Sequence, residues 1–373
     1  MGSMGKDIFF DFARACISAA DIDVVFLANY PEEAKWAPLV AVELYGYGMV
    51  DIPSDVPWID HLNNIPPLPE DLDAIIKSAA KTSDAAIAVT GSQQALVSAK
   101  AGLDFFRQNQ KPEIIFLAAD SQTHQADMKK LENLDFYICN INSGNSSPQE
   151  KSVYDEVVSL LGKKYGDESR LLNFNIADDA FKGAFSILSP ASLFLLAVRG
   201  VDIENIIAGA RLEPVRGTDN FVPQACGDIG TGKEHLIPVS YIAVKYYTII
   251  RSMLARQGKS DEIILWLDPR FETFAHWLKY LFNENPTGLS VTDEKLLPGR
   301  AVPAQNSFET ILDFGDYAST EDGKKNRTLI TEISRNRSVS RSPILRVELP
   351  DGSPHSYGRL VALFSRGSHI LWK

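Results

Sequence analysis

The stretch Asp84-Ala85-Ala86-Ile87-Ala88-Val89-Thr90-Gly91-Ser92 decides the fold class. Residues 85–89 are apolar without polar alternation, so they predict a strand that is buried on both faces, as in a parallel sheet. Gly91 and Ser92 then turn the chain, and residues 94–106 place their apolar side chains at helical spacing. A buried strand that leads directly into an amphipathic helix is the repeating unit of doubly wound α/β sheets.

The same alternation of strand and helix extends along the chain. The pattern predicts strands over 114–117 and 136–139, and helices over 8–20, 71–81, 125–131, 153–161 (after Pro148 in its first turn) and 189–211. A second series has helices over 239–256, 271–282 and 355–365, strands over 263–267, 311–312 and 344–347, and a short strand at 371–373. We therefore predict an α/β protein with two doubly wound αβα sandwich domains and mainly parallel sheets.

The chain of 373 residues is long enough for two such domains. Residues 1–69 are expected to form a helical and irregular N-terminal segment. The first domain is expected over 70–211 and the second over 237–373. The stretch 212–236, which is rich in Gly and contains Pro, is the expected linker between them.

Charge and composition exclude several classes of partner. The net charge of -11 disfavours nucleic acid, because a phosphate backbone needs a basic face. Cys16, Cys139 and Cys226 lie far apart and form no CxxC pair, which disfavours a disulfide framework and a cysteine-ligated zinc. No apolar run approaches the length of a membrane span, and no signal peptide is visible. We expect a cytoplasmic protein without a membrane segment.

Two loops at expected strand ends have the chemistry to hold an anion. In a parallel sheet the carboxyl ends of the strands lead into helix N-termini, whose backbone N–H groups favour negative charge. In the first loop, Gly91 allows close approach of the backbone and Ser92 can donate a hydrogen bond. The second loop supplies hydroxyl and amide donors with no carboxylate among them: Ser143, Gly144, Asn145 and Ser146. We predict that both loops bind one phosphate group, although such loops also serve as ordinary turns and helix caps.

A third stretch, Gly227-Asp228-Ile229-Gly230-Thr231-Gly232-Lys233, has the spacing of a nucleotide-binding P-loop. The next residue is Glu234, where a P-loop has the Ser or Thr that holds magnesium. Residues 220–226, which precede it, do not have the pattern of a buried strand. We therefore interpret this stretch as an interdomain loop rather than a nucleotide site.

Several segments, in the same order, resemble glucose-6-phosphate isomerases, which are built from two sugar-isomerase domains. The stretch that ends at Ser92 is similar to the family's strand ending in Gly-Ile-Gly-Gly-Ser, and residues 136–146 are similar to its Ser-Lys-Ser-Gly-Thr-Thr phosphate loop. Residues 181–189 resemble its Gly-Gly-Arg-Phe/Tyr-Ser segment, and residues 274–284 resemble the stretch that carries the catalytic glutamate. The resemblance runs from about residue 70 to the C-terminus.

The resemblance implies aldose–ketose isomerisation of a hexose 6-phosphate, by proton transfer between C1 and C2, without a metal or other cofactor. Glu284 falls at the position of the family's catalytic base, and a closing pocket would raise its pKa toward the working pH. His355 is the candidate to replace the family's ring-opening histidine. Because family members are usually dimers, the resemblance also implies a homodimer.

The sequence departs from the family's pattern at several catalytic positions. Ala184 stands where the family has an arginine, and loss of such an enediolate stabiliser typically costs about 10²–10³ in rate. Asn142 replaces the lysine of the phosphate loop. At the histidine loop, one alignment places Asn306 in the position of the histidine, and another, on Phe308-Glu309-Thr310, deletes the loop. The family's C-terminal helix, which carries a lysine, is expected to be absent. Two functions stay open: an isomerase that uses Glu284, or a non-catalytic relative that binds a phosphosugar or only a protein partner.

Overall fold

The computed structural model of the protein describes residues 23–26, 85–106, 111–119, 122–142, 144, 146–166, 169–176, 183–210, 261–283, 290–297, 307–314, 328–329, 344–349 and 351–371. The chain divides into two compact units. The first unit comprises residues 56–204 and 276–281, and the second comprises residues 1–55, 205–275 and 282–373. The helices expected over 8–20, 71–81 and 239–256, and the expected linker over 212–236, lie outside the described residues.

The first unit is built around a sheet that has four strands within the described part of the chain. Their order is β3 (Glu113–Leu117), β2 (Ala85–Gly91), β4 (Asp135–Asn142) and β5 (Leu171–Asn175), and each pair of neighbours is parallel. Ile87 of β2 and Ile138 of β4 are fully buried, as the continuous apolar runs predict. The sequence does not predict β5, because this edge strand carries Asn173 and Asn175 in place of such a run.

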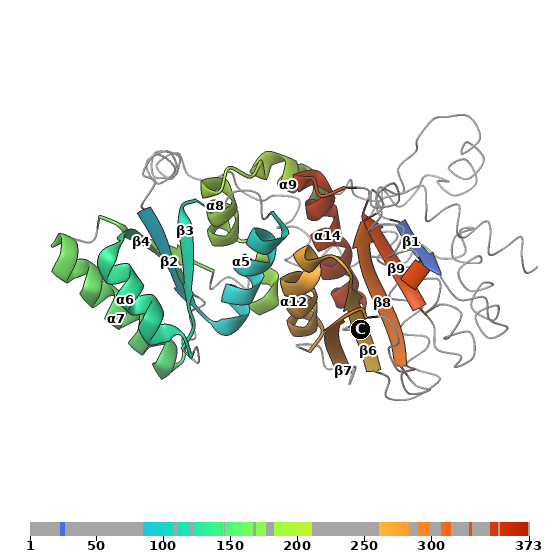
Figure 1. Ribbon diagram of the computed structural model, residues 1–373, viewed down its shortest axis with the longest axis horizontal. Coiled ribbons are helices and arrows are strands. Elements are labelled where there is room, and N and C mark those ends of the chain that lie inside the picture. Colours follow the sequence, from blue (N-terminus) through green and yellow to red (C-terminus); the bar gives the residue numbers. More distant parts are fainter. Residues whose placement is uncertain are drawn as a thin grey trace, which may run out of the picture. The chain divides into compact units, whose positions relative to one another are not determined.

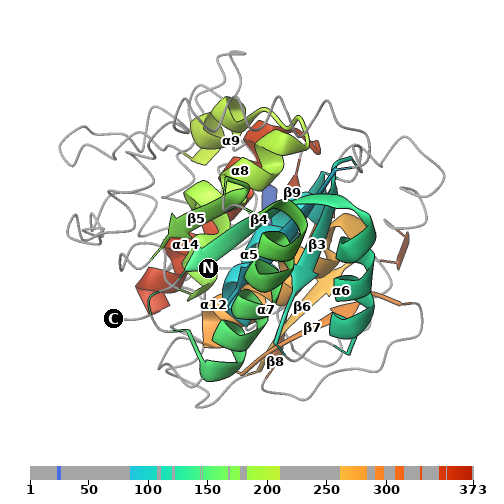
Figure 2. The same ribbon diagram turned by 90° about the vertical axis from the view of Figure 1, so that its left-hand side faces the viewer.

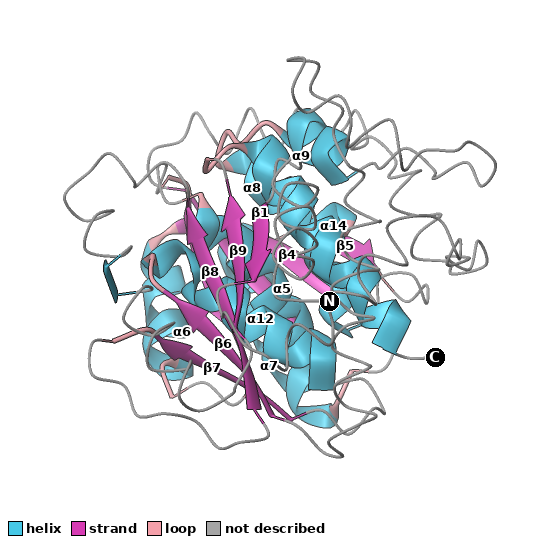
Figure 3. Ribbon diagram, turned by 90° about the vertical axis from the view of Figure 1, so that its right-hand side faces the viewer, coloured by secondary structure: helices cyan, strands magenta, loops and turns pink. Residues whose placement is uncertain are grey.

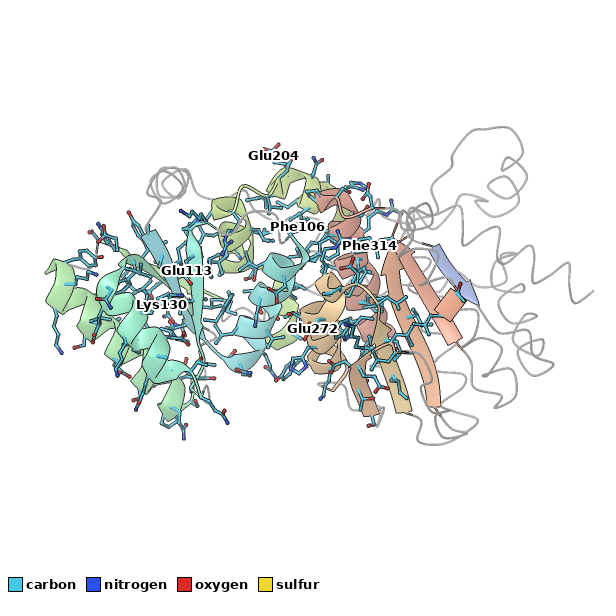
Figure 4. All side chains as sticks on the ribbon, viewed as in Figure 1. Phe106, Glu113, Lys130, Glu204, Glu272 and Phe314 are labelled. Atoms are coloured by element: carbon cyan, nitrogen blue, oxygen red, sulfur yellow. The ribbon has the colours of Figure 1, made fainter. Side chains whose placement is uncertain are left out.

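Helices cover both faces of this sheet (Figure 1). On one face, α5 (Gln93–Phe105) and α8 (Pro190–Val198) share a buried core with β2 and β4. On the other face, α6 (His124–Asn133) and α7 (Pro148–Tyr165) pack against the same strands, and Figure 2 shows these helices toward the viewer. Lys130 of α6 and Glu113 of β3 form a surface ion pair (Figure 4), an interaction worth less than about 1 kcal/mol. This arrangement confirms the predicted doubly wound sheet.

The starts of the helices in the first unit follow their capping residues. At the start of α5, the Ser92 hydroxyl oxygen accepts from the backbone N–H of Ala95 at 3.4 Å. At the start of α7, Ser147 and Glu150 form a reciprocal capping box, and Pro148 occupies the first turn as predicted. The helical stretch expected over 189–211 consists of two helices, α8 and α9 (Ile203–Ala210), because Gly200 between them has a φ of 75°.

The second unit is built around a sheet with five strands among the described residues. Their order is β1 (Asp23–Phe26), β9 (Ile344–Leu349), β8 (Ser307–Phe314), β6 (Asp261–Trp266) and β7 (Ser290–Lys295). β6 pairs in parallel with β7 and β8, β8 pairs in parallel with β9, and β1 pairs antiparallel with β9. The two mainly parallel sheets confirm the predicted fold class. The sequence does not predict β7, because this edge strand ends in the charged run Asp293-Glu294-Lys295.

Two helices lie on the same face of the second sheet (Figure 3). They are α12 (Glu272–Asn283), which follows a short 3₁₀ turn at Pro269–Phe271, and α14 (Pro354–Leu371). Their aromatic side chains interlock: the rings of Phe274 and Tyr357 lie 6.2 Å apart, and those of Phe282 and Phe364 lie 6.5 Å apart. The middle of α12, residues 276–281, is part of the first unit.

The prediction of a short strand over 371–373 is wrong for Leu371, because this residue is the last one of α14. The sequence over 354–371 contains Leu360, Phe364 and Leu371 at helical spacing, so the helix continues beyond the expected end at Ser365. Residues 372–373 lie outside the described part of the chain.

Helix α9 crosses α14 at very short range within the second unit. A Cβ atom placed on Gly209 would lie 2.1 Å from the backbone oxygen of His355, and one placed on Gly358 would lie 2.1 Å from the backbone oxygen of Ile206. Real Cβ atoms do not approach so closely, so both positions need glycine. This crossing fixes the backbone at the start of α14, where His355 lies.

Candidate functional site

The order of the strands in the first unit defines where a ligand would enter. β2 comes first in the chain, β3 lies on one side of it and β4 on the other, so the connections after β2 and β4 diverge. In open α/β sheets, ligands bind at the carboxyl ends of the strands at this topological switch point. The loops that start at Gly91 and Asn142 leave the sheet here, because Gly91 is paired with Ile141.

The end of β2 is shaped for close approach to β4. A Cβ atom on Gly91 would lie 3.0 Å from the backbone oxygen of Ile141 and 3.1 Å from its Cβ. Glycine therefore allows the two strand ends to stay side by side without displacement. Ser92, which follows, is half-buried, and its oxygen accepts from Ala95 N, which leaves its O–H group as a hydrogen-bond donor.

The end of β4 turns sharply into α7. Gly144 has a φ of 77°, and its backbone N–H donates to Oδ1 of Asn142 at 3.0 Å. Ser146 is half-buried and lies next to Ser147, the N-cap of α7. Ser143 and Asn145, the other two residues predicted for this loop, lie outside the described residues.

The loop itself contains no carboxylate, but the start of α7 brings one beside it. Glu150 folds back over the helix start, and its Oε2 accepts from the backbone N–H of Ser147 at 2.7 Å. Its backbone N–H in turn donates to the Ser147 hydroxyl oxygen at 3.2 Å. This reciprocal contact occupies the backbone N–H groups of Ser147 and Glu150, which could otherwise donate to an anion. It also places the negative charge of the Glu150 carboxylate beside them. An anion at this edge would therefore depend on the groups before Ser147.

A row of polar side chains that the sequence does not single out crosses the same edge. Thr90, Asn140 and Asn173 are in register on β2, β4 and β5. The Thr90 hydroxyl donates to Oδ1 of Asn140, and Nδ2 of Asn140 donates to Oδ1 of Asn173, both at 3.0 Å. The available signal was the repetition of Asn at alternate positions in β4 and β5, because alternate residues share one face of a sheet.

The position that resembles the family's arginine lies in the core of the first unit. Ala184 is fully buried, and its backbone oxygen accepts from Nε1 of Trp277 at 2.7 Å and from the Ser98 hydroxyl at 3.3 Å. Trp277 lies in the part of α12 that belongs to the first unit. The methyl side chain of Ala184 supplies no charge, and the two hydrogen bonds fix the backbone around it.

Of the two catalytic candidates taken from the resemblance, the structure describes only His355. Glu284 lies outside the described residues, directly after the end of α12. His355 is half-buried near the start of α14. Burial alone would raise the pKa of the nearby Asp351 carboxyl, but hydrogen bonds from Ser353 and Ser356 and the charge of His355 together lower that pKa. The catalytic role that the resemblance implies for His355 stays a prediction.

Two further findings concern the described part of the chain alone. No group of His, Cys, Asp or Glu side chains there could hold a metal ion. No helix there is long and apolar enough to cross a membrane. The P-loop-like stretch over 227–233 lies outside the described residues.

Comparison with known proteins supports the fold class first. The structure is similar to that of a hypothetical protein from Thermus thermophilus, with a TM-score of 0.62, 13% identity, and coverage of 92% of this chain and 91% of that one. It is also similar to a glucose-6-phosphate isomerase from Chlamydia trachomatis, with a TM-score of 0.53, 11% identity, and coverage of 97% of this chain and 74% of that one. The chain thus shares with these proteins an α/β fold, which here has two mainly parallel sheets.

The sequence comparison makes the relationship more specific. The chain is 26% identical over 243 residues to the glucose-6-phosphate isomerase of Bacillus anthracis, and this match covers 56% of the chain and 50% of the relative. The enzyme of Bacillus cereus strain AH820 matches to the same extent. The chain thus spans about half the length of the curated relatives it matches, and no family model matches it. The predicted resemblance to glucose-6-phosphate isomerases is confirmed as a distant one.

Proposed function

We propose that the protein binds a phosphosugar at the carboxyl edge of the first unit's sheet, with the phosphate between Ser92 and residues 143–146. The observation that supports this proposal is the pairing of Gly91 with Ile141, because the two strand ends from which the donor-bearing loops start lie side by side at a topological switch point. The sequence match to glucose-6-phosphate isomerases supports a sugar phosphate as the anion. The fold of these relatives does not by itself determine the ligand.

Calorimetric titration with fructose 6-phosphate and with inorganic phosphate tests the binding. We expect saturable binding of both, and a rise in melting temperature with ligand concentration, because a ligand that binds the folded state stabilises it by mass action. Magnesium-ATP is the control, and we expect no stabilisation by it. The proposal is wrong if neither phosphate compound binds at concentrations up to tens of millimolar.

Isomerase chemistry through Glu284 is the second candidate, favoured by the match to glucose-6-phosphate isomerases. In this reaction the carboxylate would carry a proton between C1 and C2 of the open-chain sugar. Ala184 weighs against a fast reaction, because no cation at that position would stabilise the enediolate. Binding without turnover would assign the protein to the non-catalytic alternative.

A coupled assay that converts fructose 6-phosphate to glucose 6-phosphate separates the two candidates. An isomerase would lose its turnover in Glu284→Gln, which keeps the shape of the side chain and removes the base. Glu272→Gln, at the exposed first residue of α12 (Figure 4), is the matched control and should leave turnover unchanged. Equal turnover in wild type and Glu284→Gln would exclude Glu284 as the base.

The homodimer implied by the resemblance remains part of the proposal. Light scattering of the purified protein measures its mass in solution, and twice the chain mass of 41.2 kDa is the expected value. A monomeric mass would remove this part of the proposal without affecting the ligand.

A further inference from the structure

One face of the first unit's sheet changes its chemistry toward the carboxyl edge. On the face that α6 and α7 cover, Ala88 of β2 and Ile138 of β4 are fully buried in an apolar core. The next residues along the same face are Thr90 on β2 and Asn140 on β4, and their neighbour on β5 is Asn173. A row of hydroxyl and amide groups at the end of an apolar face is unfavourable for stability unless the groups are hydrogen-bonded, because burying polar groups costs free energy. Such a row therefore suggests a functional role.

The hydrogen bonds along this row all point in one direction. Thr90 is 1% exposed and donates to Asn140, and Asn140 is half-buried and donates to Asn173, which is exposed. The hydroxyl of Tyr154 on α7 also approaches Oδ1 of Asn173, at 3.5 Å. The row therefore begins in the core and ends at a side chain that faces solvent.

The last amide of the row presents donors outward. Oδ1 of Asn173 already accepts from Asn140, so the remaining groups of the side chain are the two N–H donors of Nδ2. Asn142 is also exposed and lies two residues after Asn140 on the same face. Its Oδ1 accepts from the backbone N–H of Gly144, so its Nδ2 likewise keeps its two N–H donors. Hydrogen bonds in a chain polarise one another, which strengthens the donors at its end.

We propose that Asn173, together with Asn142, binds acceptor oxygens on the sugar part of the ligand whose phosphate lies at Ser92, Gly144 and Ser146. Amides are neutral, so this pair suits a hydroxyl or carbonyl oxygen better than a second phosphate. The inference rests on the proposed phosphosugar binding and adds a specificity residue to it. It also gives β5, the edge strand that the sequence does not predict, a part in recognition.

Asn173→Asp is the sharpest test, because it replaces only the outward Nδ2 by an oxygen. The remaining Oδ1 still accepts from Asn140 and Tyr154, so the row and the fold are retained. We expect the dissociation constant of fructose 6-phosphate to rise by about 10-fold or more, since a lost donor is replaced by a repelling acceptor. The constant for inorganic phosphate, which does not reach Asn173, should change by less than about 2-fold, the size expected of a screened surface charge.

Gln125→Glu is the matched control, because it makes the same amide-to-carboxylate change at an exposed position on α6. It should leave both dissociation constants within about 2-fold of the wild type, as a screened charge does. A parallel loss of both ligands in Asn173→Asp would show general charge repulsion and overturn the inference, as would an unchanged constant for fructose 6-phosphate. If the wild type binds neither ligand, the proposed function fails and this inference fails with it.

Thr90→Val tests the row from its buried end. Valine keeps the shape of threonine and removes the hydroxyl that orients Asn140. If the row orients Asn173, fructose 6-phosphate should bind about 3-fold more weakly, while inorganic phosphate binds as before. A purely structural role of Thr90 would lower the melting temperature and leave the ratio of the two dissociation constants unchanged, which would contradict the inference.

Discussion

Ser92 combines a structural and a proposed binding role at the carboxyl end of β2. Its oxygen caps α5 through Ala95 N, and its O–H group is a proposed phosphate donor. We expect Ser92→Ala to lower the free energy of unfolding by about 1 kcal/mol, the usual cost of a lost cap. It should also weaken phosphate binding by about 3- to 10-fold, because it removes one hydrogen bond to a charged group.

The control for this substitution is another serine cap in the same unit. Ser189 caps α8 by accepting from the backbone N–H of Ser192, and it is fully buried. Ser189→Ala should therefore lower the melting temperature without changing the phosphate affinity measured by calorimetry. Equal loss of affinity in both variants would mean that Ser92 acts only through stability.

Two glycines of the first unit are expected to respond in opposite ways to alanine. At Gly91 the added methyl group would lie 3.0 Å from the Ile141 oxygen, so Gly91→Ala should destabilise the protein by about 1–3 kcal/mol. Gly162 is exposed within α7 and has no neighbouring atom within 4 Å of the added Cβ, so Gly162→Ala should stabilise by about 0.5–1 kcal/mol. Urea denaturation measures both changes, and an equal response would refute the close approach of β2 to β4.

At the scale of elements, the capping box of α7 competes with the proposed anion. Glu150→Gln keeps a side-chain oxygen for Ser147 N and removes the negative charge beside the loop. We expect inorganic phosphate to bind about 2- to 5-fold more tightly, because repulsion across a partly screened distance is removed. Asp155→Asn, on an exposed position further along α7, should change the affinity little. Weaker binding in Glu150→Gln would place the anion away from α7.

The crossing of α9 and α14 in the second unit leaves no room for a side chain at Gly209 or Gly358. Gly209→Ala would bring a methyl group to 2.1 Å from the His355 oxygen, so the helices would have to separate. We expect a loss of about 2–4 kcal/mol in the free energy of unfolding, as for a strongly overpacked core. Thermal denaturation of Gly209→Ala, with Gly162→Ala as the control, measures the loss of stability. An unchanged melting temperature in Gly209→Ala would contradict the close crossing of the two helices.

At the scale of the whole molecule, Cys139 reports on the integrity of the first unit. Its side chain is fully buried in β4, and burial raises the pKa of its thiol. In a Cys16→Ser/Cys226→Ser background we expect no reaction with iodoacetamide in the native protein and complete reaction in denaturant. Mass spectrometry measures the label, and rapid labelling of the native protein would show that the sheet opens locally.

The residues predicted for the site came from local chemistry, and their arrangement came from the fold. Gly91, Ser92, Gly144 and Ser146 were recognisable as a turn and a cap after an apolar run. Asn173 was not, because its strand is short and partly polar and its neighbours on β2 and β4 are distant in sequence. Ser147 and Glu150 have the Ser-x-x-Glu spacing of a capping box, but this local pattern predicts only a helix start and does not show that the carboxylate lies beside the loop.

The sequence by itself determined the alternation of buried strands and amphipathic helices, and hence the class of the fold, because continuous apolar runs and helical spacing are local patterns. It also determined the distant resemblance to glucose-6-phosphate isomerases. Only the tertiary structure decided which loops meet, since the order β3-β2-β4-β5 places the ends of β2 and β4 side by side. Strand order depends on packing between residues far apart in the chain, and that packing is not encoded in any single segment.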